Sequence, residues 1–230
     1  MTKKTLQWSG YEWIVKSGAR KTGPGPNYFA GENAWVDRDG RLHLMITKHK
    51  NKWRCAEVTL SETLGYGTYR FWLEGRPDRM DLNGVLGLFT YDGSSPEHHH
   101  REIDIEFARW GNPGGHNAQY VVQPYSIPGH LHSFPMKLNG NCSTHTFKWT
   151  PGSIRFMSLH GHYTDLPSPL EWFKIQDWEY TGDIPDRKEE KVGINLWLMD
   201  GKAPAEGMEI VVDRFEFQPL TCQVGIYIRK

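Results

Sequence analysis

Cysteine is scarce in this sequence, and net charge and long apolar runs are lacking. Its 230 residues include three cysteines and no C-x-x-C pair, so nothing supports a cysteine zinc site or disulfide redox chemistry. The 27 Lys and Arg balance the 27 Asp and Glu, which argues against nucleic acid as a partner. No run of about 18 apolar residues occurs, so we expect no membrane span. No G-x-S-x-G sequence frames a serine, so a serine-hydrolase triad has no support.

Aromatic residues and turn formers are abundant instead, with ten each of Trp, Tyr and Phe, 24 Gly and 14 Pro. Helical spacing is scarce, whereas apolar and polar residues alternate in short runs, as is typical of half-buried antiparallel strands. Turn clusters at 37–40, 91–96, 111–115 and 138–141 separate some of these runs. We predict strands at 42–46, 54–60, 69–73, 85–91, 102–108, 118–124, 146–149, 154–159, 192–198 and 210–217.

Many short strands without obligatory helices predict an all-β sandwich of two antiparallel layers around one core. In such a fold, 230 residues fit a single domain, 1–230, which buries enough surface to fold without disulfides or metals. The Gly- and Pro-rich segment 22–27 follows too few residues to link two domains, and we interpret it as a surface loop.

Segment 101–107, Arg-Glu-Ile-Asp-Ile-Glu-Phe, is the most informative part of the sequence. Side chains alternate along a strand, so Glu102, Asp104 and Glu106 share one face while the apolar residues between them enter the core. Neighbouring carboxylates about 6.6 Å apart repel by roughly 0.6 kcal/mol in water and more inside a protein. The row therefore indicates either chemistry or the protection of an exposed edge strand.

Glycoside hydrolysis is a chemistry that gives a reason for such a row, because it requires a pair of carboxyl groups with different pKa values. One is ionised and attacks the anomeric carbon, and the other is protonated and donates to the leaving oxygen. A third carboxylate helps to raise the pKa of the donor. On a flat strand the Cα atoms of Glu102 and Glu106 are about 13 Å apart, so a retaining mechanism requires the side chains to lean together. An inverting mechanism is the alternative if they do not converge.

Residues 102–107 resemble the signature of glycoside hydrolase family 16, particularly bacterial lichenases, the endo-β-1,3-1,4-glucanases. The resemblance implies a β-jelly roll of two curved antiparallel sheets with a concave cleft. It makes Glu102 the nucleophile, Glu106 the general acid/base and Asp104 the acid that tunes them. The absence of an extra residue before Glu106 favours the lichenase and xyloglucan-transglycosylase side of the family over laminarinases. Further segments in the family's order lie at 55–57, 65–69, 89–93, 147–149 and 195–197, covering about residues 27–217.

The resemblance also implies sugar contacts. Four residues match positions that bind sugar in lichenases: Glu57, Tyr91, Asn195 and Trp197. A flat aromatic ring with a polar edge suits this task, because it lies on a sugar face and still donates a hydrogen bond.

The sequence departs from lichenases beside the nucleophile, so we expect different sugar contacts beside the cleaved bond. His100 and Arg101 replace the Trp and Asp that precede the nucleophile in lichenases. The Asn expected on the next strand falls at Val121, so Gln119 becomes a candidate for contact with substrate, with Gln123 nearby.

Histidine and tryptophan residues around the acidic strand leave two questions open. The run 98–100 suggests a metal site, but side chains on an extended chain alternate, so at most His98 and His100 share a ligand. The alternative is contact with substrate at the cleft rim, for which His100 is best placed. Trp110 either lines the cleft or caps the core. We interpret the remaining large indole side chains as packing residues: Trp53, Trp72, Trp149, Trp172 and Trp178.

Two structural features of lichenases are only partly matched. Cys55 matches a half-cystine, but its partner's place is taken by about Asn27, so we expect no disulfide there. The calcium ligands of lichenases, a carbonyl in a Gly-containing turn and an Asp on the last strand, resemble Gly40 and Asp213. The alternative for Asp213 is a surface ion pair with Arg214.

We therefore expect a retaining, endo-acting hydrolase of a β-linked polysaccharide, a β-1,3-1,4- or β-1,3-glucan, with no catalytic cofactor and a structural Ca²⁺ as an open question. We expect a monomer with no nucleic-acid or membrane partner. The alternatives are a non-catalytic lectin-like carbohydrate-binding module, a family 16 galactan hydrolase and a transglycosylase. Secretion or a periplasmic location is expected for such an enzyme, although no leader is visible. The odd cysteine count suits a reducing cytoplasm equally, so that location stays open.

Overall fold

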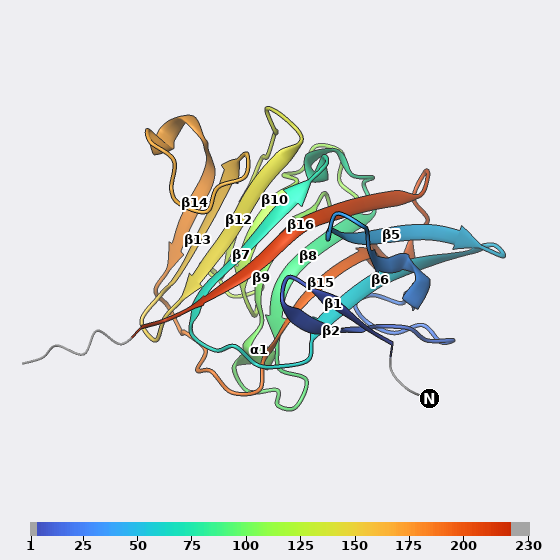
Figure 1. Ribbon diagram of the computed structural model, residues 1–230, viewed down its shortest axis with the longest axis horizontal. Helices are drawn as coiled ribbons and strands as arrows, with labels where there is room; N and C mark the ends of the chain where they lie inside the picture. Colours follow the sequence, from blue (N-terminus) through green and yellow to red (C-terminus); the bar gives the residue numbers. More distant parts are fainter. Residues whose placement is uncertain (1–3, 222–230) are drawn as a thin grey trace, which may run out of the picture.

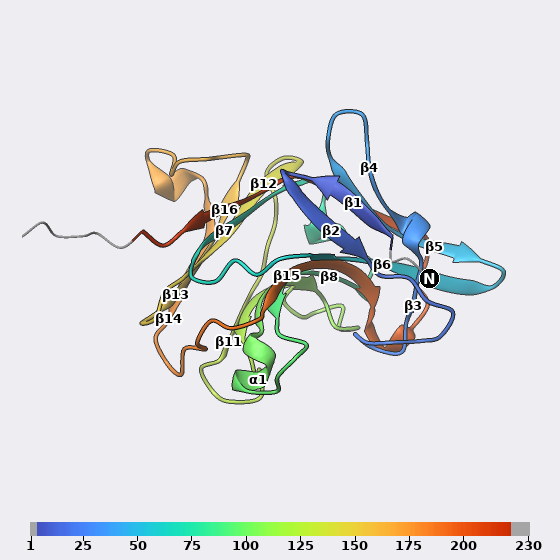
Figure 2. The same cartoon turned by 60° about the horizontal axis from the view of Figure 1, so that its bottom comes forward.

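The computed structural model describes residues 4–221, whose strands form two antiparallel layers (Figures 1 and 2). In spatial order, the first sheet comprises β1 (Thr5–Trp8), β2 (Tyr11–Val15), β6 (Lys52–Leu60), β15 (Lys191–Leu198), β8 (Gly84–Tyr91), β9 (Ile103–Ala108), β10 (Ala118–Val122) and β11 (Leu131–Phe134). The second sheet comprises β4 (Ala34–Val36), β5 (Leu42–His49), β16 (Met208–Pro219), β7 (Gly67–Glu74), β12 (Cys142–Trp149), β13 (Ile154–His160) and β14 (Lys174–Tyr180).

The β5–β6 hairpin joins the two sheets, and the short β3 (Tyr28–Phe29) pairs parallel to β6. Helical structure is limited to single turns in the described residues: η1 (Gly31–Asn33), η2 (Pro77–Arg79), α1 (His98–Arg101), η3 (Leu170–Trp172) and η4 (Met199–Gly201). Within residues 4–221, no helix is long and apolar enough to cross a membrane.

The core lies between the sheets, because each strand turns its apolar residues inward. On β9 the inward residues Ile103, Ile105 and Phe107 are fully buried. The Phe107 ring lies 4.7 Å from the ring of His145 on β12, so the two layers are in direct contact. Burying a side chain of this size contributes roughly 1.5–3 kcal/mol to folding. The fold therefore aims the opposite face of β9 away from the core.

The predicted all-β sandwich is confirmed, and each of the ten predicted strands matches a strand of the structure. Strands β1 to β4, β11 and β14 were not predicted; most of them are short or carry polar residues on both faces. The packing interpretation of Trp172 is wrong, because this side chain lies in η3 with 77% of its surface exposed. The other four indole rings are buried or pack against the core.

Candidate active site

The three acidic residues of the predicted row lie on the outward face of β9 and at its start. Asp104 is 4% exposed, whereas Glu102 and Glu106 are half-buried and reach solvent. Glu102 directly precedes β9 with an extended backbone (φ −84°, ψ 121°), so the alternation continues through it. The prediction that these three carboxyl groups share one face, opposite Ile103 and Ile105, is confirmed.

The strand register extends this face into a line of polar residues across the first sheet. Glu106 pairs with Gln119 on β10 and with Gly87 on β8. Gly87 pairs with Asn195 on β15, which in turn pairs with Glu57 on β6. A Cβ atom at Gly87 would lie 2.6 Å from Asn195 Oδ1, so only glycine lets the Asn195 side chain occupy this place. The sheet thus brings predicted site residues from four strands together.

Burial and mutual repulsion keep protons on the carboxyl row. Burial, followed by the charge of Glu106, raises the pKa of Glu102 to about 8. Burial also raises the pKa of Glu106 to about 7, and burial with both glutamate charges raises that of Asp104 well above its usual range. Because these shifts are coupled, they belong to the row as a whole, and near neutral pH the row holds both protonated and ionised carboxyl groups.

Two glutamine side chains of β10 donate hydrogen bonds to this row. Gln119 Nε2 donates to Glu106 Oε2 at 2.7 Å, and Gln123 Nε2 donates to Asp104 Oδ2 at 3.0 Å. Each bond stabilises the ionised form and opposes the rise in pKa of its acceptor. Gln119 therefore contacts a catalytic candidate directly, a contact that the sequence comparison with lichenases did not indicate.

Glu57 and Asn195 present buried oxygen atoms that have no partner in the described part of the chain. Glu57 is 9% exposed, and its Oε1 accepts a hydrogen bond from Lys16 Nζ at 2.8 Å. Glu57 Oε2 and Asn195 Oδ1 have no hydrogen-bond partner among residues 4–221. Burial raises the pKa of Glu57, and the Lys16 ammonium and the neighbouring Asn195 side chain oppose that rise. Unpaired buried acceptors are costly, so these two are suited to receive hydroxyl groups of a ligand.

Trp110 lines a cavity beside Glu106. Its Nε1 donates to Gln119 Oε1 at 3.3 Å, and its ring meets that of Trp197 edge-on at 6.1 Å. Trp110 is also part of the wall of a cavity of about 420 Å³, together with Arg109, Asn112, His116, Gln119 and Ser133. Trp110 is thus only partly buried and faces this cavity.

Tyr91 and His100 form a stacked pair next to the nucleophile candidate. Their rings are 4.7 Å apart and inclined by 16°, and Tyr91 is 38% exposed. Burial and then the charge of Glu102 raise the pKa of Tyr91. The expectation of an extended chain through 98–100 is wrong, because His98, His99 and His100 all adopt positive φ in the turn α1.

Gly40 and Asp213, the residues named for calcium, have no cluster of metal-binding side chains around them in the described part of the chain. Beside Gly40, the guanidinium of Arg41 pairs with the carboxylates of Asp37 and Asp39. Asp213 Oδ2 instead lies 4.0 Å from His162 Nδ1. Across residues 4–221, no group of three or more His, Cys, Asp or Glu side chains is arranged to hold a metal ion, the histidine run included.

Cys55 is buried and forms no disulfide within the described residues. Asn27, which stands at the place of the lichenase partner cysteine, donates through Nδ2 to the carbonyl oxygen of Leu198 at 2.8 Å. This bond ties the loop 22–27 to the end of β15. Cys222 lies outside the described residues.

The fold class is that of the jelly-roll β-glucanases. Solved structures similar to this chain include the Bacillus licheniformis β-glucanase, with a TM-score of 0.70 and 18% identity over 96% of this chain and 100% of that one. A prokaryotic β-1,3-1,4-glucanase (lichenase) from a mouse hindgut metagenome has a TM-score of 0.65 and 21% identity, with the same coverage. Rv0315 of Mycobacterium tuberculosis, described as an immunostimulatory antigen and pseudo β-1,3-glucanase, has a TM-score of 0.61 and 19% identity over 90% of this chain and 91% of that one.

No family model and no curated protein matches the chain. At these identities the structural similarity shows the fold, and it confirms the predicted jelly roll. The site residues must therefore be judged by their own geometry.

Proposed function

We propose that this protein is a retaining, endo-acting glycoside hydrolase that cleaves a β-1,3-1,4- or β-1,3-glucan. The observation that carries the proposal is the row Glu102, Asp104 and Glu106, which faces away from the core and retains protons near neutral pH. Crowding three carboxyl groups costs stability, and glycoside hydrolysis is a chemistry that uses the resulting pKa shifts. Two similar solved structures are β-glucanases by description, which supports this substrate class.

The coupled carboxyl row shares its protons, and the reactive form is the one in which Glu102 is ionised and Glu106 is protonated. In the proposed first step, a Glu102 oxygen in this form attacks the anomeric carbon and forms a glycosyl ester. The bond from that carbon to the leaving oxygen breaks, and the proton of Glu106 passes to the leaving oxygen. In the second step, water attacks the same carbon and releases Glu102, while Glu106 takes the proton of the water. Gln119 stabilises the Glu106 carboxylate that exists between the two steps, because it donates to Oε2.

The substrate lies across the line of polar residues in this proposal. Glu57 Oε2 and Asn195 Oδ1 accept sugar hydroxyl groups, which satisfies two buried acceptors. The rings of Trp110, Trp197 and Tyr91 offer apolar faces to the sugar rings.

Assays of the wild-type protein and of Glu102→Gln and Glu106→Gln test the proposal. Lichenan, laminarin, agarose and xyloglucan are the substrates, and viscosity, reducing ends and products are measured. We expect cleavage of lichenan or laminarin by the wild type, a fall in viscosity ahead of the release of reducing ends, and a loss of at least about 1,000-fold in each variant. Residual hydrolysis near the wild-type rate in both variants contradicts the proposal.

The roles of the two glutamates are separated by azide rescue of alanine variants on an activated aryl glycoside. With Glu102→Ala, azide replaces the nucleophile and gives the α-glycosyl azide. With Glu106→Ala, azide attacks the glycosyl-enzyme and gives the β-product. NMR of the initial product of the wild type tests retention, because an inverting enzyme would release the α-anomer.

A non-catalytic glucan-binding protein is the second candidate. One protein with this fold is described as a pseudo β-1,3-glucanase, and this description favours the second candidate. A binding protein needs no acidic pair. Calorimetry with glucan oligosaccharides would then show unchanged affinity in Glu102→Gln and Glu106→Gln, with no cleavage by the wild type.

A further inference from the structure

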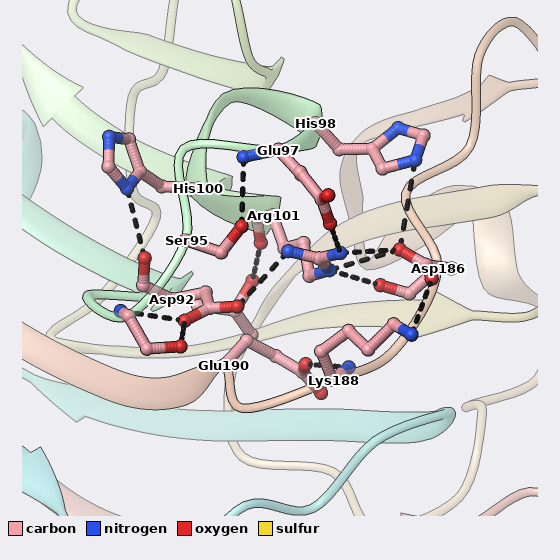
Figure 3. Close-up of polar contacts among 11 residues, drawn as sticks. Asp92, Ser95, Glu97, His98, His100, Arg101, Asp186, Lys188 and Glu190 are labelled. Carbon is pink, nitrogen blue, oxygen red and sulfur yellow. Dashed lines mark hydrogen bonds and ion pairs between the residues drawn. The ribbon is translucent and has the colours of Figure 1, made fainter.

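Arg101, directly before the nucleophile candidate, is buried among carboxylates. Its side chain is 1% exposed. The guanidinium contacts three acidic residues from different segments, as Figure 3 shows: Asp92 at 3.1 Å, Glu97 at 3.0 Å and Asp186 at 2.9 Å. Arg101 Nε also donates to the backbone carbonyl of Asp186 at 3.0 Å. A buried guanidinium that fills its donors in this way fixes the segments around it.

The segment that Arg101 belongs to has an unfavourable backbone conformation. All four residues of α1, His98 to Arg101, have φ between 45° and 64°, so α1 is a single left-handed turn without glycine. A left-handed conformation costs an L-residue roughly 1–2 kcal/mol. Such a turn persists only where contacts determine it, and contacts of this kind concentrate at functional sites.

Hydrogen bonds from the turn fix two features that the proposed reaction uses, the Tyr91–His100 pair and the peptide before Glu102. The Asp92 N–H donates to the His100 carbonyl at 2.6 Å, and His100 Nδ1 donates to the Asp92 carbonyl at 2.9 Å. These bonds hold the His100 ring against Tyr91. The Thr90 hydroxyl donates to the Arg101 carbonyl at 2.9 Å, which fixes the peptide that leads into Glu102.

We propose that Arg101 is a positioning residue for the hydrolysis, and that its buried ion pairs hold the left-handed turn α1. In this conformation the turn places the Tyr91–His100 pair, which contacts the sugar, and orients the backbone that leads into Glu102. The inference rests on the proposed function and assigns a role to a residue that has no sugar contact. A displacement of about 1 Å in a catalytic group is enough to cost about 100-fold in rate.

The role of Arg101 is geometric, because its charge is not a cause of the Glu102 pKa shift. Burial and the charge of Glu106 account for that shift. The charge of Arg101 is compensated within the cluster by Asp92, which is fully buried, and by Asp186 and Glu97. Removal of Arg101 alone would leave Asp92 buried and unpaired, which destabilises a fold whatever the role of the arginine.

The test therefore uses the double variant Arg101→Met with Asp92→Asn, which removes the buried charge together with its partner. Replacing both members of a buried pair is often neutral for stability. We expect Arg101→Met to lose both melting temperature and activity. We expect the double variant to recover most of the melting temperature while kcat/KM on lichenan stays about 100-fold below wild type, with kcat lowered and KM raised.

Arg41→Met is the matched control, because Arg41 also pairs with three carboxylates, those of Asp37, Asp39 and Glu74, but leads into the second sheet. We expect wild-type kcat and KM in this control. A double variant that regains wild-type kcat and KM along with its melting temperature overturns the inference, since Arg101 would then serve stability alone. Failure of the proposed function appears instead in the wild-type protein, as an absence of cleavage, and overturns this inference with it.

Discussion

The row of Glu102, Asp104 and Glu106 keeps protons at pH values where an unfolded chain has lost them. Within the row, burial and then the charge of Glu106 raise the pKa of Glu102 from 4.5 to about 8. For a carboxyl group with a raised pKa, the folded state binds more protons than the unfolded state between these two values. The contribution to stability is therefore complete below pH 4.5 and is lost as the pH rises through 8. The carboxyl group to which the proposed function gives a role thus destabilises the fold as the pH rises towards 8.

Glu102→Gln consequently stabilises the protein in a pH-dependent manner. We expect its melting temperature to exceed that of the wild type by several degrees at pH 8, at about 2–4 °C per kcal/mol, and to equal it at pH 4. Differential scanning calorimetry at the two pH values measures this. Glu206→Gln, which alters an exposed carboxylate, is the control and should change neither value. An equal shift at both pH values would show that ionisation of Glu102 is not the cause.

Burial raises the pKa of Glu106, whereas the hydrogen bond from Gln119 lowers it. The bond favours the ionised form, so Gln119→Leu should raise the pKa of Glu106 further. If Glu106 is the general acid, the alkaline limb of the kcat/KM profile should move up by about one pH unit, the size expected for a charged hydrogen bond. Gln218→Leu, on the exposed face of β16, serves as the control. A downward or absent shift would contradict the contact.

At the scale of elements, the alternation of apolar and polar residues was enough to predict the strands that have one buried face and one solvent-facing face. In β9 every second residue is apolar, so the position of the carboxyl row could be predicted before the fold was known. Strands β11 and β14 could not be predicted in this way, because their polar residues, such as His132 and Asp177, break the pattern.

Contacts between residues far apart in the sequence could not be predicted, because no local sequence pattern indicates them. The pair of Lys16 and Glu57 joins residues 41 positions apart, and nothing near either residue indicates the other. The left-handed turn α1 contains neither Gly nor Asn, the residues that favour positive φ, so the sequence predicted an extended chain there. The ion pairs of Arg101 with Asp92 and Asp186 determine this conformation, and they form only in the folded chain.

A buried polar chain between the two sheets provides a second link between pH and stability. His145 on β12 is fully buried, with Nδ1 2.7 Å from Ser158 Oγ and Nε2 2.9 Å from Ser143 Oγ. Tyr120 on β10 donates to the same Ser158 oxygen at 2.7 Å, which connects the chain of polar groups to the first sheet. Burial lowers the pKa of His145 to about 3 from 6.5. The folded state therefore keeps this imidazole neutral where the unfolded state protonates it.

His145→Gln tests this link. A lowered histidine pKa makes stability complete above pH 6.5, and stability is lost as the pH falls from 6.5 towards 3. Between pH 7.5 and 4.5 the wild type should lose about 2–3 kcal/mol more in free energy of unfolding than the variant. Urea titrations at the two pH values measure this difference, and each protein is its own reference at pH 7.5. An identical pH dependence in both proteins would mean that His145 is protonated in the folded state.

At the scale of the whole molecule, β6 connects the two sheets and carries part of the site. It pairs with β15 and β2 in the first sheet and forms the hairpin with β5 that leads into the second. Glu57 in the polar line and the buried Cys55 lie two positions apart on it. Exposure of Cys55 thus requires separation of the strands that hold the site together.

Labelling of Cys55 should consequently report global unfolding. Burial raises the pKa of this thiol to about 12, so the folded protein presents neither access nor thiolate to a disulfide reagent. In a Cys142→Ser, Cys222→Ser background, we expect the labelling rate to rise with urea concentration with the same slope as the global unfolding equilibrium. We expect a bound glucan oligosaccharide to slow labelling by the factor with which its binding stabilises the folded state. Labelling that is fast, independent of urea and unaffected by oligosaccharide would instead place Cys55 in a locally opening segment, and the two sheets would then not unfold as one unit.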